Sequence, residues 1–156
     1  MKHRRFMLEA IRLSRVHMIK GHGGPFGAVV VKNGRIVGRG WNQVTSTNDP
    51  TAHAEVMAIR DACKKLKSYD LSEALIYTSC EPCPMCLAAI YWARVGGIYY
   101  GNTRKDAAKI QFDDEFLYKE ISKPHLKRLV PIKQIFRKEA LVAFDLWTEN
   151  ENKLSY

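Results

Sequence analysis

Two short clusters of metal-ligand side chains, well separated in the sequence, constrain the fold of this chain more than any other feature. The upstream cluster holds His53 and Glu55, and the downstream cluster holds Cys83 and Cys86. A histidine nitrogen and cysteine sulfurs are preferred ligands of Zn²⁺, and three protein ligands leave a fourth position for water, as in catalytic sites. If these residues bind one ion, the fold must bring the two clusters together.

Each cluster lies at the start of a predicted helix. Pro84 suits the first helical position, where the N–H that proline lacks would have no partner. Cys83 is therefore predicted at the helix cap and Cys86 one turn further on, with both sulfurs on one face. A helix start also favours thiolates. His53 follows the Asp-Pro-Thr sequence of residues 49–51, which has the pattern of another helix start.

Glu55 is predicted to carry protons and not to bind the metal. Residues two apart on a helix point nearly opposite ways, so Glu55 reaches the metal only if His53 lies at the helix edge. A carboxylate there can move a proton from an activated water to a substrate nitrogen and then to a leaving amine. We predict one Zn²⁺ per chain bound by His53, Cys83 and Cys86, with Glu55 as the catalytic residue.

The Cys-x-x-Cys pattern also occurs in sites of different kinds. The pair could be a redox couple, a disulfide or half of a structural zinc site, in which Cys80 would be the additional ligand. Cys80 lies at the end of a predicted strand, and the chain would have to turn back for its sulfur to bind the same ion. Cys63 lies in a helical pattern and is predicted to be a small core residue.

The surroundings of these motifs indicate the compartment. Three clustered cysteines fit a reducing compartment better than a disulfide scaffold. Residues 1–5 are basic, but no apolar signal-peptide region follows them, and no stretch is apolar enough to span a membrane. We therefore expect a cytoplasmic protein without a membrane partner.

The hydrophobic pattern predicts one domain in which helices and strands alternate. The 156 residues, 46% hydrophobic and 26% charged, suit a single globular domain. An Asn-Gly turn joins the first two predicted strands. The last predicted strand would lie at the edge of the sheet, and Pro131 within it makes that prediction weaker. Helices between strands imply parallel crossovers and an α/β fold with both sheet faces covered. The predicted strands are residues 26–31, 36–41, 74–78, 97–101 and 130–135, and the predicted helices are residues 4–20, 53–66, 83–94, 103–109 and 140–150.

The net charge of +9 is compatible with two interpretations. A strongly basic protein can bind nucleic acid. Here Lys and Arg are spread along much of the chain, and no basic stripe is interleaved with aromatic residues, so the charge also fits a solvated surface. It gives only weak support to an RNA substrate.

The sequence resembles the cytidine deaminase-like zinc deaminases and, within them, the bacterial guanine deaminases. The first three matching segments also occur in tRNA adenosine deaminases, so they indicate the chemistry, whereas the last three resemble guanine deaminases in particular. The resemblance implies a three-layer α/β/α sandwich with a central mixed five-stranded sheet. The matching segments are residues 24–28, 48–55, 78–86, 90–94, 112–114 and the terminal Tyr156.

The resemblance also implies a substrate-binding set. Asn42 would hydrogen-bond the purine, Asp114 would accept from guanine N–H groups, and Phe26 and His53 would flank the ring. Tyr156 would close the pocket from an exchanged C-terminal segment, about residues 130–156, of the partner in a homodimer. Each residue could also serve a purely structural purpose, such as a turn former for Asn42 or a helix cap for Asp114.

The implied reaction is hydrolysis of guanine to xanthine and ammonia. Asp114 suits the donor edge of guanine, whereas adenine presents an acceptor at N1 and would leave the carboxylate unpaired. The alternatives are a tRNA adenosine deaminase, a deaminase of another small amino-heterocycle such as an aminotriazine or a pterin, and a zinc-stabilised binding module. Glu55 argues against the last alternative, since a structural zinc site does not need that carboxylate.

Overall fold

A run of small and β-branched residues forms one of the two inner strands of the sheet. In the computed structural model, which describes residues 2–154, this strand is β1 (Gly27–Lys32), and all but its last residue are buried. The Asn-Gly turn after it adopts positive φ at both residues, 51° at Asn33 and 70° at Gly34, as predicted. It leads into β2 (Arg35–Trp41), which pairs antiparallel with β1.

The sheet is mixed and has four strands in the order β2-β1-β3-β4. β3 (Ala74–Cys80) runs antiparallel to β1, and β4 (Gly97–Asn102) runs parallel to β3. The prediction of a fifth strand over residues 130–135 is wrong, because that segment is irregular in the described part of the chain. Pro131 has no N–H to donate to a strand ladder, which is the physical reason to expect no strand there.

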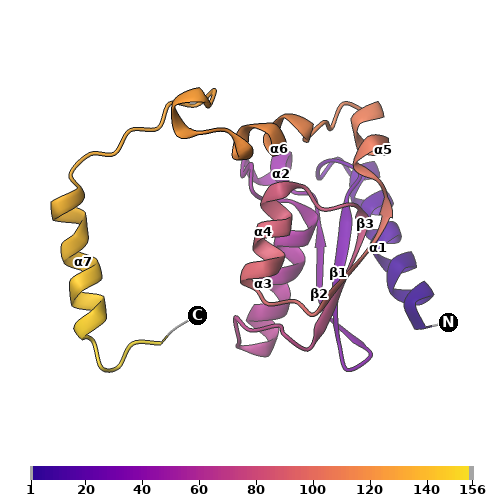
Figure 1. The fold of residues 1–156 in the computed structure, drawn as a ribbon. Coiled ribbons are helices and arrows are strands. Elements are labelled where there is room, and N and C mark those ends of the chain that lie inside the picture. Colours follow the sequence, from indigo (N-terminus) through magenta and orange to yellow (C-terminus); the bar gives the residue numbers. More distant parts are fainter. Residues whose placement is uncertain (1, 155–156) are drawn as a thin grey trace. The chain divides into compact units, whose positions relative to one another are not determined.

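Helices cover both faces of this sheet, as Figure 1 shows, so the predicted three-layer α/β/α arrangement is confirmed. α1 (Lys2–Ile19) lies on one face and buries Phe6 and Leu13 against Val29, Val31 and Tyr77. α3 (Ala54–Leu66) and α4 (Pro84–Trp92) lie on the other face. The second core cluster fills that side with residues 28, 30, 54, 58, 62, 71, 74, 76, 90 and 93.

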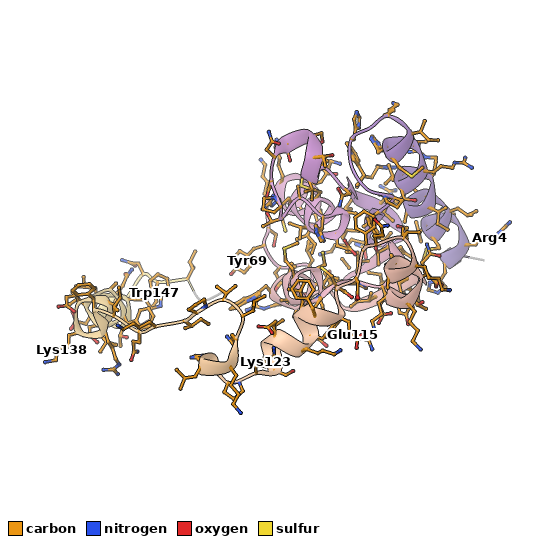
Figure 2. The ribbon with its side chains drawn as sticks, turned by 90° about the horizontal axis from the view of Figure 1, so that it is seen from above. Arg4, Tyr69, Glu115, Lys123, Lys138 and Trp147 are labelled. Atoms are coloured by element: carbon orange, nitrogen blue, oxygen red, sulfur yellow. The ribbon has the colours of Figure 1, made fainter. Side chains whose placement is uncertain are left out.

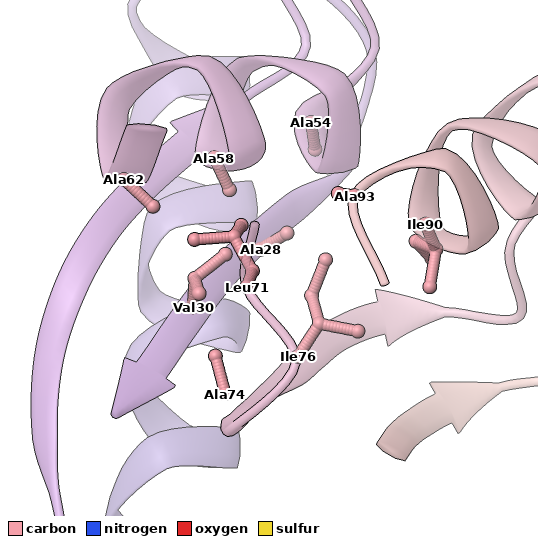
Figure 3. Close-up of a cluster of buried hydrophobic side chains, with 10 residues drawn as sticks. All are labelled: Ala28, Val30, Ala54, Ala58, Ala62, Leu71, Ala74, Ile76, Ile90 and Ala93. Carbon is pink, nitrogen blue, oxygen red and sulfur yellow. The ribbon is translucent and has the colours of Figure 1, made fainter. Parts of the chain in front are cut away.

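Small residues let α3 approach β2 very closely. Ala54, Ala58 and Ala62 recur at helical spacing on the buried face of α3, as Figure 3 shows. A Cβ atom added to Gly40 of β2 would lie 2.1 Å from the Ala54 carbonyl oxygen, and one added to Gly38 would lie 2.3 Å from that of Ala58. Only glycine fits at these two strand positions, and the close packing fixes the start of α3 against the sheet.

Short elements complete the first of two compact units, which ends at Asp114. α2 (Val44–Thr47) is a single turn inside the predicted polar loop, and α5 (Arg104–Lys109) begins after a capping box formed by Thr103 and Asp106, close to its predicted start. No helix within residues 2–154 is long and apolar enough to cross a bilayer.

The second unit begins at Glu115 and has a different character. It comprises α6 (Glu115–Ser122), a 3₁₀ turn at His125–Lys127 and α7 (Arg137–Glu149), which starts three residues before the predicted helix. None of its residues up to 154 is buried. Figure 2 views α7 nearly along its axis, and its side chains, Lys138 and Trp147 among them, radiate on several sides.

Candidate metal centre

His53 is the N-cap residue of α3 and lies outside the helix itself. Its backbone is extended, with φ −71° and ψ 156°. The predicted helix start at residues 49–51 is wrong: the Asp49 carboxylate accepts from the Thr51 N–H at 2.8 Å and from its hydroxyl at 2.6 Å, closing a turn. Residues two apart within a regular helix point in nearly opposite directions. Because His53 precedes the first helical turn, its ring and the Glu55 side chain are not restricted in this way.

Cys83 occupies the same position on α4. It is the N-cap residue, with φ −67° and ψ 169°, and Pro84 follows at the first helical position, as predicted. Cys86 lies in the first turn and is fully buried. Two helix starts therefore supply the ligands, and each helix dipole favours negative charge at that end.

The three predicted ligand atoms converge. The Nδ1 atom of His53 lies 3.5 Å from the sulfur of Cys83 and 3.5 Å from that of Cys86, and all three ligand atoms lie within 4.8 Å of one another. With a Zn–N bond of about 2.1 Å and Zn–S bonds of about 2.3 Å, nitrogen and sulfur ligands of a tetrahedral zinc lie roughly 3.6 Å apart. The donor set and its spacing therefore fit Zn²⁺, with Nδ1 as the histidine ligand atom.

The electrostatics of the cluster place negative charge on Cys83. A hydrogen bond from the Cys86 thiol, assisted by the His53 ring, lowers the pKa of Cys83 to about 4 although burial opposes this. The same contact with Cys83, together with burial, raises the pKa of Cys86. The pKa of His53 is raised, chiefly by its hydrogen bond to Cys83. A thiolate is thus present at Cys83, and zinc binding must displace the remaining protons.

Glu55 lies buried beside this cluster. The Thr78 hydroxyl, on β3, donates a hydrogen bond of 3.1 Å to its Oε1 atom. Burial is the main cause of a raised pKa at Glu55, and the charge on Cys83 adds to it, although a hydrogen bond from the Cys86 thiol opposes it. A carboxyl group with a raised pKa is a stronger base than an exposed glutamate, which suits a proton carrier.

Asn42 is also buried, directly after β2. Its Oδ1 atom accepts hydrogen bonds from the Gly24 and Val44 backbone N–H groups, each at 3.2 Å. With both lone pairs of that oxygen used, the amide nitrogen is the group that Asn42 offers to a ligand, and it can only donate. Phe26 is half-buried, and its ring meets that of Phe112 edge to face.

Of the two remaining predicted binding residues, the structure describes Asp114 but not Tyr156. Asp114 is half-buried at the end of the first unit, and burial raises its pKa, with a further contribution from the charge on Cys83. It therefore interacts electrostatically with a predicted metal ligand. Tyr156 lies outside the described residues.

Cys80 is not a fourth ligand of the cluster formed by the described residues. Its sulfur contacts the Thr103 carbonyl oxygen at 3.7 Å, and burial raises its pKa to about 11. A neutral thiol of this kind is a poor metal ligand. Cys63 is half-buried and packs against the core, as predicted.

Sequence reasoning gave no role to two residues that the structure brings to this region. Thr78 orients Glu55, and Phe112 packs on Phe26. The signal for Thr78 was a pair of polar residues, Thr78 and Ser79, within an otherwise apolar strand. Phe112 lies in the matching segment of residues 112–114, but its contact with Phe26 joins residues far apart in the sequence, so no local pattern predicted that contact.

Comparison with known proteins agrees with this geometry. Residues 1–102 match the family described as the cytidine and deoxycytidylate deaminase zinc-binding region. The chain belongs to the cytidine and deoxycytidylate deaminase family. As a member of this family it has a zinc-binding site, formed by His53, Cys83 and Cys86. The predicted cofactor and its ligands are confirmed.

Two kinds of deaminase resemble the chain over different lengths. It is 51% identical to a guanine deaminase of Bacillus subtilis (strain 168) over 156 residues, which is 100% of both chains. The crystal structure of guanine deaminase from Bacillus subtilis matches 100% of this chain and 99% of its own, with a TM-score of 0.97. A tRNA-specific adenosine deaminase of Buchnera aphidicola is 42% identical over 88 residues, which is 56% of this chain and 58% of that protein.

Proposed function

We propose that this protein is a guanine deaminase, which converts guanine and water to xanthine and ammonia. The observation that carries the proposal is the strength and reach of the similarity. A guanine deaminase is 51% identical over the whole chain, and a guanine deaminase structure matches it with a TM-score of 0.97. A tRNA-specific adenosine deaminase is 42% identical over 56% of the chain, and a solved tRNA:A34 deaminase that covers 84% of it has a TM-score of 0.66. The zinc-binding motifs belong to the segments that resemble tRNA adenosine deaminases as well, whereas residues 112–114, which include Asp114, resemble guanine deaminases in particular.

We assign base recognition to four side chains of the first unit. The Asn42 amide nitrogen donates to a purine acceptor such as O6 or N7, because its oxygen already accepts from the backbone. Asp114 accepts from guanine N–H groups, which requires its ionised form. Phe26 and the His53 ring flank the base on its two faces. This set would leave adenine with an acceptor against a carboxylate, an unpaired arrangement that strongly disfavours binding.

Glu55 performs the proton transfers. When bound, zinc supplies the activation of the attacking water. Glu55 accepts a proton of that water and delivers it to N3 of guanine as oxygen adds to C2. It then takes the proton of the new C2 hydroxyl and transfers it to the exocyclic amine, which leaves as ammonia as the C2–N bond breaks and the C2 carbonyl of xanthine forms. The Thr78 hydroxyl keeps the Glu55 carboxyl group oriented for both transfers.

The second unit is assigned to closing the site in a homodimer. Its described residues bury no side chain, and α7 exposes Phe144, Leu146 and Trp147. A helix with such side chains requires an apolar surface to cover them. We propose that residues from about 130 to 156 are exchanged between subunits and that Tyr156 covers the bound base. Exclusion of water by such a lid favours the reaction. The cysteine ligands need reduced thiols, so we place the enzyme in the cytoplasm.

Ammonia release from guanine, adenine, cytosine and a tRNA tests the proposal. We expect release from guanine and none from the other three. Asp114→Asn should lower kcat/KM for guanine roughly 10- to 100-fold, the scale of a hydrogen bond to a charged group, without loss of zinc. Asp113→Asn, one residue away, is the matched control and should change kcat/KM far less. Release from tRNA with none from guanine would instead assign the protein to RNA modification.

A further inference from the structure

Phe112 forms an aromatic pair with the proposed base-flanking residue Phe26. The two ring centroids lie 4.9 Å apart and the ring planes meet at 84°. This edge-to-face geometry places the positive edge of one ring against the negative face of the other, so it fixes ring orientation as well as distance. Phe112 is nonetheless 47% exposed and belongs to neither core cluster. Its contribution to the hydrophobic core is therefore small.

The backbone of Gly24 lies against both rings. A Cβ atom built on Gly24 would approach the Phe112 Cζ atom to 3.1 Å and the Phe26 ring to 3.2 Å. The Gly24 N–H is also the group that donates to the Asn42 Oδ1 atom. Phe112, Gly24, Phe26 and Asn42 thus form one continuous set of contacts that includes two of the proposed base-binding side chains.

The same ring restrains the segment that carries Asp114. The chain turns at Gln111, where φ is 71°, and the Phe112 N–H donates to the Ala107 carbonyl oxygen at 3.0 Å. Asp114 follows only two residues later. With its backbone tied to the end of α5 and its ring packed on Phe26, Phe112 limits the positions that the Asp114 carboxylate can take.

We propose that Phe112 is a positioning residue for purine binding, which aligns the Phe26 ring and the Asp114 carboxylate through these contacts. The inference rests on the proposed guanine deaminase function and deepens it. Phe112 does not take part in proton transfer. Its loss should weaken guanine binding and leave the zinc site and the chemical step intact.

A double-mutant cycle tests this role in the full-length zinc enzyme. Phe112→Leu should raise the KM for guanine roughly three- to tenfold, the range that corresponds to one aromatic pair, while kcat stays within about twofold and zinc content is unchanged. In a Phe26→Leu background the same substitution should raise KM less than about twofold, because the partner ring is already lost. Ile110→Ala, two residues away and 52% exposed, is the control and should leave KM unchanged.

The outcomes separate this inference from the function on which it rests. If the wild-type enzyme releases ammonia from guanine but Phe112→Leu leaves KM unchanged, or raises it equally in both backgrounds, the positioning role is wrong. A parallel loss of zinc, thermal stability and kcat would indicate a structural role instead. If the wild-type protein does not deaminate guanine at all, the proposed function fails, and the role of Phe112 in guanine binding fails with it.

Discussion

Residues 2–114 bury valine, leucine, isoleucine and tyrosine side chains completely, whereas no residue of 115–154 is more than partly buried. Both parts contain helices with apolar side chains, so the difference does not come from composition alone. The first unit has a sheet that offers two apolar faces, and its helices cover them. The second unit has helices without a sheet of its own, and α7 exposes Phe144 at 71%. A segment of this kind gains stability mainly by packing on another surface.

We propose that the first unit carries the chemistry and that the second closes the site. Zinc ligation, the proposed proton carrier and the proposed base-binding residues Phe26, Asn42 and Asp114 all belong to the first unit. Of the proposed base-binding residues, only Tyr156 belongs to the second unit. Changes in the first unit should therefore affect the metal, the chemical step or the core, and changes in the tail should affect substrate affinity.

Loss of a metal ligand should have the largest effect. We expect Cys86→Ala to lose the zinc and with it nearly all activity, because two remaining ligands hold the ion poorly. Cys80→Ala, which removes a neighbouring thiol outside the cluster, should keep about one zinc per chain. Metal analysis of the purified variants measures both. Zinc retained in Cys86→Ala, or lost in Cys80→Ala, would contradict the ligand assignment.

Removal of the proton carrier should be next in size. Glu55→Gln keeps the shape of the side chain and the hydrogen bond from Thr78, so fold and zinc content should be unchanged. Turnover of guanine should fall at least about 100-fold, the usual scale of general acid–base catalysis. Steady-state kinetics on zinc-saturated enzyme decide the matter, and turnover near that of the wild type would refute the assignment.

Deletion of residues 154–156 should have a smaller effect, confined to substrate handling. We expect zinc content and fold to be kept while the KM for guanine rises, or kcat falls, roughly tenfold, the scale of one aromatic contact with a hydrogen bond. Mixing this variant with Glu55→Gln chains tests exchange between subunits. An intact Glu55 site that borrows the other chain's tail regains activity. No recovery after confirmed subunit exchange would show that no tail acts across subunits.

A change at the contact between β2 and α3 should destabilise the first unit without altering its chemistry directly. Gly40→Ala puts a methyl group against the backbone of α3, and overpacking of this kind costs about 1–3 kcal/mol. Urea unfolding of the zinc-loaded protein measures the loss. Gly97→Ala is the control, because its added methyl group meets only the flexible Leu75 side chain at 3.0 Å. Equal stability of both variants would argue against the close packing.

The smallest effect should come from a half-buried histidine of the first unit. His17 stacks on Trp41 at 3.6 Å, and burial lowers its pKa from 6.5, with smaller contributions from His22, Lys20 and Arg12. The unfolded chain therefore binds the proton more readily, so His17 contributes stability above pH 6.5 that is lost as the pH falls through its folded pKa. Thermal unfolding at about pH 7.5 and about pH 5.5 should show a smaller decrease for His17→Phe than for the wild type.

Residue type and spacing by themselves determined the metal ligands. Pro84 and the cap position of Cys83 depend only on local backbone chemistry, so the start of α4 and the direction of its two sulfurs were predicted correctly. The Asn-Gly turn and the apolar run of β1 are local for the same reason. The same local pattern failed at residues 49–51, where the Asp49 side chain bonds to Thr51 and closes a turn before α3 begins.

Only the tertiary structure decided which residues surround the metal site and the proposed base-binding residues. Thr78 meets Glu55, the Gly24 N–H fixes the Asn42 oxygen, and Phe112 packs on Phe26 across distances in sequence that no local pattern encodes. The absence of a strand at residues 130–135 in the described chain is of the same kind. Pro131 weakens the segment as a strand, but a strand also needs another strand to pair with, and the availability of a partner is a property of the whole fold.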